Sequence, residues 1–296
     1  MEFLKKNKLS STRSRYGVLF TAPVIILVVL FEFYPLLQAF YFSFTNWDGQ
    51  QSNWIGFQNF GRMFADPDLQ RVLLNGLYLM ISIPFGMTFS FVVAYLMHHS
   101  VYGSKLFRAV IFAPTALSWV IVGLVSRAFL ANDGPINKIL RAVGLKELAL
   151  NWLANETPAL ISVLITFNAA LFGMNAIIFL TGFSTLDKQV LEAAQMDGAS
   201  QIQVLRNIVV PAMYRFIVFV FIITLVASFS GIFGLIYVMT NGGPGSATTT
   251  LEFAVWTQAF AQGSFGMAAA FGIVLMVLTL VVVGVVQLLN STVEEE

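Results

Sequence analysis

Two long stretches of this 296-residue chain carry no charged side chain. From Phe216 to Leu251, and again from Phe253 to Val293, there is no Asp, Glu, Lys or Arg. A bilayer-spanning helix needs ~20 mostly apolar residues, and both stretches are longer than that. Charged residues make up only 10% of the chain, whereas a soluble domain carries about a quarter. Lipid is therefore the solvent for most of this sequence.

Apolar runs of span length follow one another along the chain. Lipid offers no hydrogen-bond partners, so only helices and closed barrels satisfy every backbone group within it. A barrel would alternate apolar and polar residues, whereas these runs are apolar on all faces. We therefore predict an all-α integral membrane protein with six transmembrane helices, at about 18–44, 73–97, 106–130, 159–183, 216–239 and 265–289. The membrane domain then covers 18–289, between an N-terminal segment 1–17 and a C-terminal tail 290–296.

Lysine and arginine are divided unequally between the two sides of these spans. Ten lie in segment 1–17 and in the loops after spans two and four, and six lie in the other loops. Loops that are richer in Lys and Arg stay in the cytoplasm. This asymmetry predicts a multi-pass protein with both termini in the cytoplasm.

The composition argues against several other classes of protein. There is no cysteine, and the only histidines, His98 and His99, are adjacent and so cannot share one helix face. A net charge of +1 gives no reason to invoke nucleic acid. No phosphate-binding GxxxxGK[ST] and no arrangement of catalytic side chains stands out. We predict no metal site, no bound nucleic acid and no enzymatic activity of the chain itself.

The segment 184–213, between spans four and five, does not read as a simple connecting loop. Leu186, Leu191 and Ala194 lie at helical spacings, which predicts a short amphipathic helix. Gly198 ends this helix, and a second helical stretch leads to Pro211. A helix–turn–helix that lies against the membrane and offers an apolar face to another surface is a docking element.

This segment resembles the EAA loop of ABC importer permeases. Glu192-Ala193-Ala194, three residues, Gly198, nine residues and then Ile208-Val209-Val210-Pro211 reproduce the family spacing, with Val210 where Leu is usual. The resemblance implies that this helix sits in a cleft of an ATP-hydrolysing subunit and transmits its closure to the spans. The alternative is that Glu192 and Asp197 only solvate a loop. The residues to which the resemblance gives ATPase coupling are Leu191, Glu192, Ala193, Ala194, Met196, Asp197, Gly198, Ile208 and Pro211.

Other segments are similar to carbohydrate permeases of the maltose-transporter type, first permease subunit. They are Phe31 to Pro35 with Ser43 to Thr45, Gly56 to Asn75, and TNGGPGSATTT from Thr240 to Thr250. The maltose subunit's extra N-terminal spans and large outer domain are missing, so the plain six-span members match better. The resemblance implies a bacterial cytoplasmic membrane and a sister permease, a heterodimer being the simplest pairing. It also implies an ATPase dimer that carries ATP and Mg, an extracytoplasmic solute-binding protein, and no cofactor on this chain. The Thr240–Thr250 loop is either an ordinary turn or a contact with that binding protein.

The resulting hypothesis is a permease subunit that moves a carbohydrate, a di- or oligosaccharide, with ATP hydrolysed by its partners. One alternative is an ion-coupled secondary transporter, for which Glu32 is the only acid well inside an apolar run. The resemblance instead places a helix break at Tyr34-Pro35, which gives Glu32 a structural or water-facing role. Another alternative is an ABC importer for glycerol phosphate or a polyol.

Polar side chains within spans are costly and tend to face a cavity or another helix. Amide, hydroxyl and aromatic groups suit a sugar, because they exchange hydrogen bonds with hydroxyls and cover C–H surfaces. The same residues could instead join helix to helix by hydrogen bonds. The candidates for the substrate pathway are Asn168, Phe172 and Asn175 on span four, and Ser228, Phe229, Ser230, Phe233 and Tyr237 on span five.

Overall fold

The computed structural model describes residues 18–98 and 104–294 of the chain. Within these ranges the fold is almost wholly helical, and only a bridge between Thr45 and Trp54 pairs two extended segments. The predicted N-terminal segment 1–17 lies outside the described residues, as does His99. The prediction of an all-α membrane protein is confirmed by this architecture and by the apolar helices described next.

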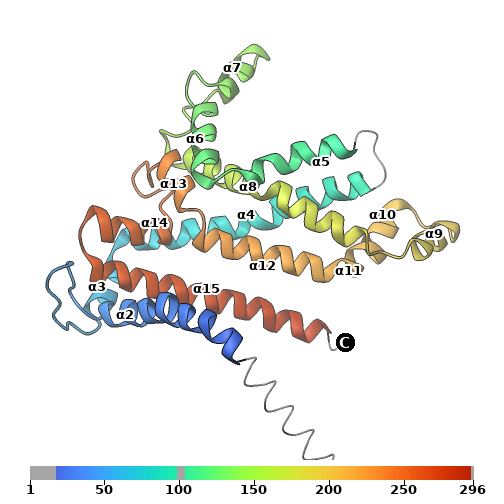
Figure 1. The fold of residues 1–296 in the computed structure, drawn as a ribbon. Helices are drawn as coiled ribbons and strands as arrows, with labels where there is room; N and C mark the ends of the chain where they lie inside the picture. The colour runs from blue at the N-terminus through green and yellow to red at the C-terminus, as the bar shows by residue number, and fades with distance from the viewer. Residues whose placement is uncertain (1–17, 99–103, 295–296) are drawn as a thin grey trace, which may run out of the picture.

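Within the described residues, four helices are long and apolar enough to cross a membrane. They are Val18–Phe42, which ends in α2 (Tyr34–Phe42), α4 (Pro67–His98), α8 (Glu156–Phe183) and the Phe265–Leu288 part of α15 (Phe265–Glu294). Figure 1 shows α4, α8 and α15 running alongside α12 (Tyr214–Ser230) as one bundle. Helices are therefore present at predicted spans one, two, four and six, although α15 continues beyond residue 289.

The first helix is continuous where a break was expected. A π-turn, η1 (Val29–Phe33), widens it so that the Tyr34 N–H donates to the Val29 carbonyl, and α2 follows directly. Pro35 has no N–H, and its ring crowds the carbonyl of the preceding turn, which a wider turn relieves. The expected break at Tyr34-Pro35 is therefore wrong, and Glu32 is exposed on the helix surface.

The third predicted span is bent rather than straight. α5 (Ser104–Phe112) and the 3₁₀ turn η2 (Ala113–Ala116) meet α6 (Trp119–Phe129) at 107°. Pro114 cannot donate to the preceding turn, and Leu117 and Ser118 are extended. The Ser118 hydroxyl then accepts from the Ile121 N–H at 3.4 Å and starts the new helix. The predicted helix over 106–130 is therefore present as two helices with a sharp bend between them.

The fifth predicted span is also interrupted. α12 ends at Ser230, and α13 (Phe233–Met239) starts after Gly231 and Ile232. Glycine has the poorest helix propensity apart from proline, so Gly231 is a natural stopping point. α13 then packs against α6, so the continuations of both bent spans lie together. Up to six crossings are possible among the described residues if two bent pairs each count as one, namely Arg108–Ala116 with Trp119–Phe129, and Gln201–Ala212 with Tyr214–Ser230.

The core lies among α4, α8 and α12. Phe167, Phe179 and Phe183 of α8 are fully buried there, as are Ile83 of α4 and Leu225 of α12. The first helix is different, because none of its apolar window is buried within the chain. Large apolar side chains also line the outer surface of the bundle, which is the distribution expected of a protein solvated by lipid.

Shorter elements close the two ends of the bundle. One end carries α3 (Gln58–Ala65), α13, α14 (Leu251–Trp256) and the π-turn η5 (Thr257–Ala261). The opposite end carries α9 (Lys188–Met196), α10 (Gln201–Val204), the π-turn η4 (Leu205–Val209) and α11 (Val210–Ala212). α7 (Pro135–Ala142) and the 3₁₀ turn η3 (Lys146–Leu148) stand off to one side.

Candidate functional site

Capping residues and one glycine set the boundaries of the helix–turn–helix in segment 184–213. The Asp187 carboxylate accepts from the Gln189 N–H at 2.9 Å and caps the start of α9. Gly198 ends the helix in the left-handed region, at φ +84°, while the Ala199 N–H closes back to the Ala194 carbonyl at 3.0 Å. Ser200 and Gln203 then form a reciprocal capping box at the start of α10. The predicted helix, turn and second helix are all present.

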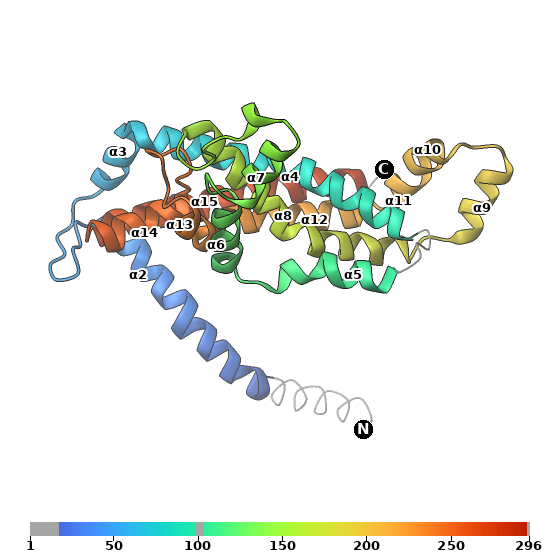
Figure 2. The same cartoon turned by 90° about the horizontal axis from the view of Figure 1, so that it is seen from above.

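The two helices divide their side chains between the bundle and the exterior. Leu191 and Ala194 pack against the core, whereas Glu192 and Ala193 are exposed. Met196 is 88% exposed, which leaves a large apolar side chain without cover. Figures 1 and 2 both show α9 projecting beyond the ends of α8 and α12. Leu191 and Ala194 belong to the apolar face that the helical spacing predicts, but they hold α9 to its own chain. The surface of α9 that another protein can contact is therefore smaller than the whole predicted apolar face.

Two exposed apolar side chains on this element were not among the predicted coupling residues. Ile202 is 77% exposed, and Val190 is exposed on α9. Ile202 stands between two glutamines, and an apolar residue in such surroundings is a signal that could have marked it. Together with Met196, these two are exposed apolar side chains on the same helix–turn–helix as the exposed Glu192 and Ala193.

The segment is joined mechanically to the bundle. In η4 the Val210 N–H donates to the Leu205 carbonyl, a π-turn just before Pro211. The stretch Gln201–Ala212 then meets α12 at 67°. Ile208 is half-buried against the core, whereas Pro211 and Asp197 are exposed. The segment is therefore continuous with α12 through η4 and α11, and it packs against the core.

Asn168 and Phe172 lie together in a groove between α8 and α4. The groove has a volume of about 520 Å³, and Ser82, Phe85, Gly86 and Phe89 line its α4 side. The Asn168 amide donates to the Ser82 hydroxyl and to the Leu164 carbonyl, both at 2.9 Å. The rings of Phe172 and Phe89 are 5.2 Å apart. Ser82 was not predicted, because a serine in a helix often bonds only its own backbone.

Asn175 does not join this groove, although it lies two turns from Asn168. It is buried, and its amide oxygen accepts from the Thr224 hydroxyl of α12 at 3.4 Å. Ser228 and Phe229 are buried too, and they line a smaller cavity of about 180 Å³ between α4, α12 and α15. Ser230 is exposed, and its hydroxyl donates to the Val226 carbonyl. The predicted pathway residues thus fall into separate environments.

Phe233 and Tyr237 belong to an aromatic cluster on α13 and α14. Their rings are 5.6 Å apart, and the ring of Trp256 lies 5.7 Å from Phe233 and 5.1 Å from Tyr237. Beside them, the Glu252 carboxylate accepts from the Phe233 N–H at 2.8 Å and caps α13. α14 is not one of the candidate spans, and burial raises the pKa of Glu252 in spite of its backbone hydrogen bonds. Glu252 is the single charge between the two uncharged stretches, and that position could have drawn attention to it.

The Thr240–Thr250 loop is a packed turn. The Asn75 amide of α4 donates to the Ser246 and Thr249 carbonyls at 2.9 and 3.0 Å, and the Thr248 hydroxyl donates to the Gly243 carbonyl at 2.9 Å. Beside the loop is a polar recess of about 550 Å³. Its polar lining includes Asp66, Asp68, Glu156, Asn241, Gln258 and Gln262. Among the described residues, no group of three His, Cys, Asp or Glu side chains could hold a metal ion.

Known proteins resemble this chain over nearly its whole length. The family model of the binding-protein-dependent transport system inner membrane component matches residues 54–295. The multiple sugar-binding transport system permease protein MsmF of Streptococcus mutans is 28% identical, over 93% of this chain and 93% of that protein. The lactose transport system permease protein LacF of Rhizobium radiobacter is also 28% identical, over 89% of this chain and 91% of that protein.

The fold has a close counterpart in a solved structure. A chain of a bacterial ABC transporter involved in the import of the acidic polysaccharide alginate superposes with a TM-score of 0.82. That match covers 96% of this chain and 99% of the other, at 23% sequence identity. The likeness confirms the fold, and the family model confirms the resemblance to ABC importer permeases. The chain belongs to the family of binding-protein-dependent transport system inner membrane components.

Proposed function

We propose that this chain is a permease subunit of an ABC importer that moves a carbohydrate, a di- or oligosaccharide, across the cytoplasmic membrane. The observation that carries the proposal is α9, which projects from one end of the bundle with Glu192, Ala193 and Met196 uncovered. The names of the relatives, which refer to lactose and to multiple sugars, support the substrate class.

In this proposal α9 enters a cleft on a partner ATPase that binds ATP and Mg. Ala193 lets the helix approach closely, Met196 fills an apolar part of the cleft, and Glu192 pairs with a basic side chain of the partner. One ATPase binds this subunit and a second binds a sister permease. When the ATPase pair closes, α9 is displaced, and the movement reaches the spans through η4 and the bend into α12.

The substrate contacts belong to the groove between α4 and α8. Its lining combines the Asn168 amide, the Ser82 hydroxyl and the rings of Phe172 and Phe89, which together suit a sugar. We assign Asn175 instead to helix packing, because its partner is Thr224 inside the core. The polar recess beside the Thr240–Thr250 loop is a surface that a solute-binding protein could contact while it delivers the sugar. No basic residue lies in the middle of a predicted span, which argues against a phosphorylated substrate.

Uptake into liposomes tests this function. The chain would be reconstituted with its sister permease, ATPase and binding protein, and supplied with radiolabelled lactose, maltotriose, sorbitol or glycerol 3-phosphate. We expect ATP-dependent uptake of a di- or oligosaccharide only, and no ATP hydrolysis by the chain alone. Uptake driven by a proton gradient without ATP would contradict the proposal, and uptake of glycerol 3-phosphate alone would overturn the substrate class.

A further inference from the structure

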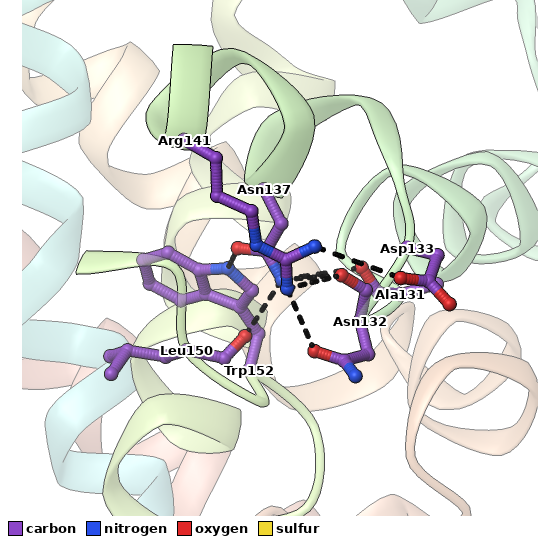
Figure 3. Close-up of polar contacts among 7 residues, drawn as sticks. All are labelled: Ala131, Asn132, Asp133, Asn137, Arg141, Leu150 and Trp152. Carbon is purple, nitrogen blue, oxygen red and sulfur yellow. Dashed lines mark hydrogen bonds and ion pairs between the residues drawn. The ribbon is translucent and has the colours of Figure 1, made fainter. Parts of the chain in front are cut away.

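Residues 131–152, which we call the α7–η3 unit, are held together by one buried side chain (Figure 3). The Asn137 amide donates to the carbonyls of Leu150, Asn132 and Ala131 at 2.9, 3.1 and 3.4 Å. The amide oxygen of Asn137 accepts from the Trp152 indole N–H at 2.9 Å. These bonds join the start and the end of the unit, so it keeps its shape without support from the long helices.

The surface of this unit combines apolar side chains with three basic and two acidic ones. Ile139 and Val143 are 62% and 64% exposed, one helical turn apart, and Leu145 and Leu148 are exposed as well. Lys138 and Lys146 are exposed beside them. Arg141 is turned toward Asn132 and Asp133 and belongs to the internal bonding of the unit. The two lysines and the exposed Glu147 are therefore the charges that remain for another surface, two positive and one negative.

The unit stands beside the bundle. α6 leaves the direction of α5 at 107° and carries the unit sideways, away from the long helices. Figure 1 shows α7 standing off the flank, toward the end of the bundle that also carries α13 and α14. For a protein whose long helices cross a bilayer, the neighbour on that flank is either phospholipid or another subunit.

We propose that the α7–η3 unit is an interfacial anchor that binds anionic phospholipid. In this arrangement Ile139, Val143, Leu145 and Leu148 enter the boundary between headgroups and acyl chains, while Lys138 and Lys146 reach the phosphates. A rigid unit with large apolar side chains and flanking lysines has the chemistry of a helix that lies in the membrane surface. The half-buried Trp152 indole suits the same depth.

The lysines favour lipid over a second protein as the occupant of this surface. Lysine is depleted in the cores of protein interfaces because its ammonium group is costly to desolvate there. At a lipid surface the same side chain extends along the apolar residues and leaves its charge among the phosphates. This proposal does not depend on the identity of the transported sugar.

Spin labels on single cysteines can measure the depth of the unit, because the natural chain has no cysteine. The variants Ile139→Cys and Val143→Cys would be labelled with a nitroxide and placed in nanodiscs of phosphatidylcholine with 30% phosphatidylglycerol. Leu280→Cys, on the exposed surface of α15, is the lipid reference, and Met196→Cys is the water reference. The measurement is the ratio of relaxation by oxygen to relaxation by a water-soluble nickel chelate.

We expect the labels on Ile139→Cys and Val143→Cys to give ratios at least several-fold above that of Met196→Cys in the chain alone. Adding Lys138→Glu and Lys146→Glu should lower these ratios in the anionic nanodiscs and change them little in pure phosphatidylcholine. Ratios equal to that of Met196→Cys would overturn the proposal. Protection from both reagents that develops only when the sister permease is present would also overturn it, and would assign the surface to a protein interface.

Discussion

At the scale of single residues, the groove between α4 and α8 depends on a glycine. Gly86 leaves the space that the Asn168 side chain occupies, and a Cβ at this position would collide with the Asn168 amide. We predict that Gly86→Ala breaks the bond between Asn168 and Ser82 and destabilises the fold by ~1–3 kcal/mol, the usual cost of overpacking. Sugar uptake should fall as well, because the groove changes shape. Thermal unfolding in detergent, followed by circular dichroism, measures the first effect.

Gly76→Ala is the matched control for that substitution. Gly76 lies on the same helix, and a Cβ there meets nothing within 4 Å. Alanine should therefore leave stability unchanged or raise it by up to about 1 kcal/mol, through its better helix propensity. If both variants unfolded at the same temperature as the natural chain, close packing at Gly86 would not be what holds Asn168 in place.

Glu252 gives the fold a dependence on pH. Because burial raises its pKa above the ordinary value of 4.5, the folded chain holds the proton more tightly than the unfolded chain does. Its contribution to stability is therefore greatest below pH 4.5 and is lost as the pH rises through the folded pKa. Glu252→Gln keeps an oxygen that can accept from the Phe233 N–H and has no charge to desolvate.

We therefore predict that Glu252→Gln gains thermal stability relative to the natural chain as the pH rises from 4 to 8. The measurement is the difference in unfolding temperature between the two proteins across that range. Glu147→Gln is a suitable comparison, because that carboxylate is exposed in η3. A difference for Glu252→Gln that shrank with rising pH would show that burial is not the dominant influence on this group.

The sequence showed which polar residues lie within the spans, but it did not show which side chains they contact. Asn168 and Asn175 are seven residues apart and were placed on nearly one face, yet one lines a groove and the other bonds Thr224. Helical periodicity fixes the direction of a side chain relative to its own axis and says nothing about which helix lies there. Partners such as Ser82 and Thr224 come from distant parts of the chain, so only the packed structure could show them.

At the scale of helices, hydropathy predicted where helices occur and missed where they bend. The bends at Leu117–Ser118 and at Gly231 fall inside apolar runs, where composition does not change. Pro114 and the Ser230-Gly231 pair are local signals of a break, but glycine and proline are also common in straight transmembrane helices. The helix–turn–helix of segment 184–213 was predicted more closely, because its caps and its glycine are local features.

Gly198 gives a test of the coupling role at this scale. It adopts φ +84°, and a Cβ there would meet nothing within 4 Å. We predict that Gly198→Asp leaves the protein inserted, at a local cost of about 1–2 kcal/mol, because only the left-handed conformation is penalised. Sugar uptake per ATP hydrolysed should nevertheless fall at least tenfold, because the end of α9 no longer holds its position in the partner's cleft. Uptake and ATP hydrolysis would be measured together in liposomes.

The chain contains a closely matched control. Gly56, just before α3 at the opposite end of the bundle, also lies in the left-handed region, at φ +61°, and a Cβ there would likewise meet nothing within 4 Å. Gly56→Asp therefore imposes a similar backbone strain without changing the segment 184–213, and it should transport normally. Equal losses in the two variants, or normal uptake by Gly198→Asp, would remove the coupling role from this glycine.

At the scale of the whole molecule, the two ends of the bundle have different characters. One end carries α9 to α11 and, close by, the C-terminal end of α15 (Figure 1). The other carries the Thr240–Thr250 loop and the polar recess beside it. Ten of the sixteen lysines and arginines lie in segment 1–17 and in the loops after predicted spans two and four, and the loop after span four is the one that forms α9 to α11. From this charge asymmetry we expect α9, and with it both termini, to lie on the cytoplasmic side.

Labelling of single cysteines from each side of the membrane tests this orientation. Met196→Cys lies on the exposed end of α9, and Gln262→Cys lies exposed after η5 at the opposite end. We predict that a membrane-impermeant maleimide labels Gln262→Cys in spheroplasts and labels Met196→Cys only in inside-out vesicles. The natural chain has no cysteine and gives the background signal. Labelling of both variants from one side would mean that the chain between them does not cross the bilayer, and the reverse pattern would mean that α9 faces away from any cytoplasmic ATPase.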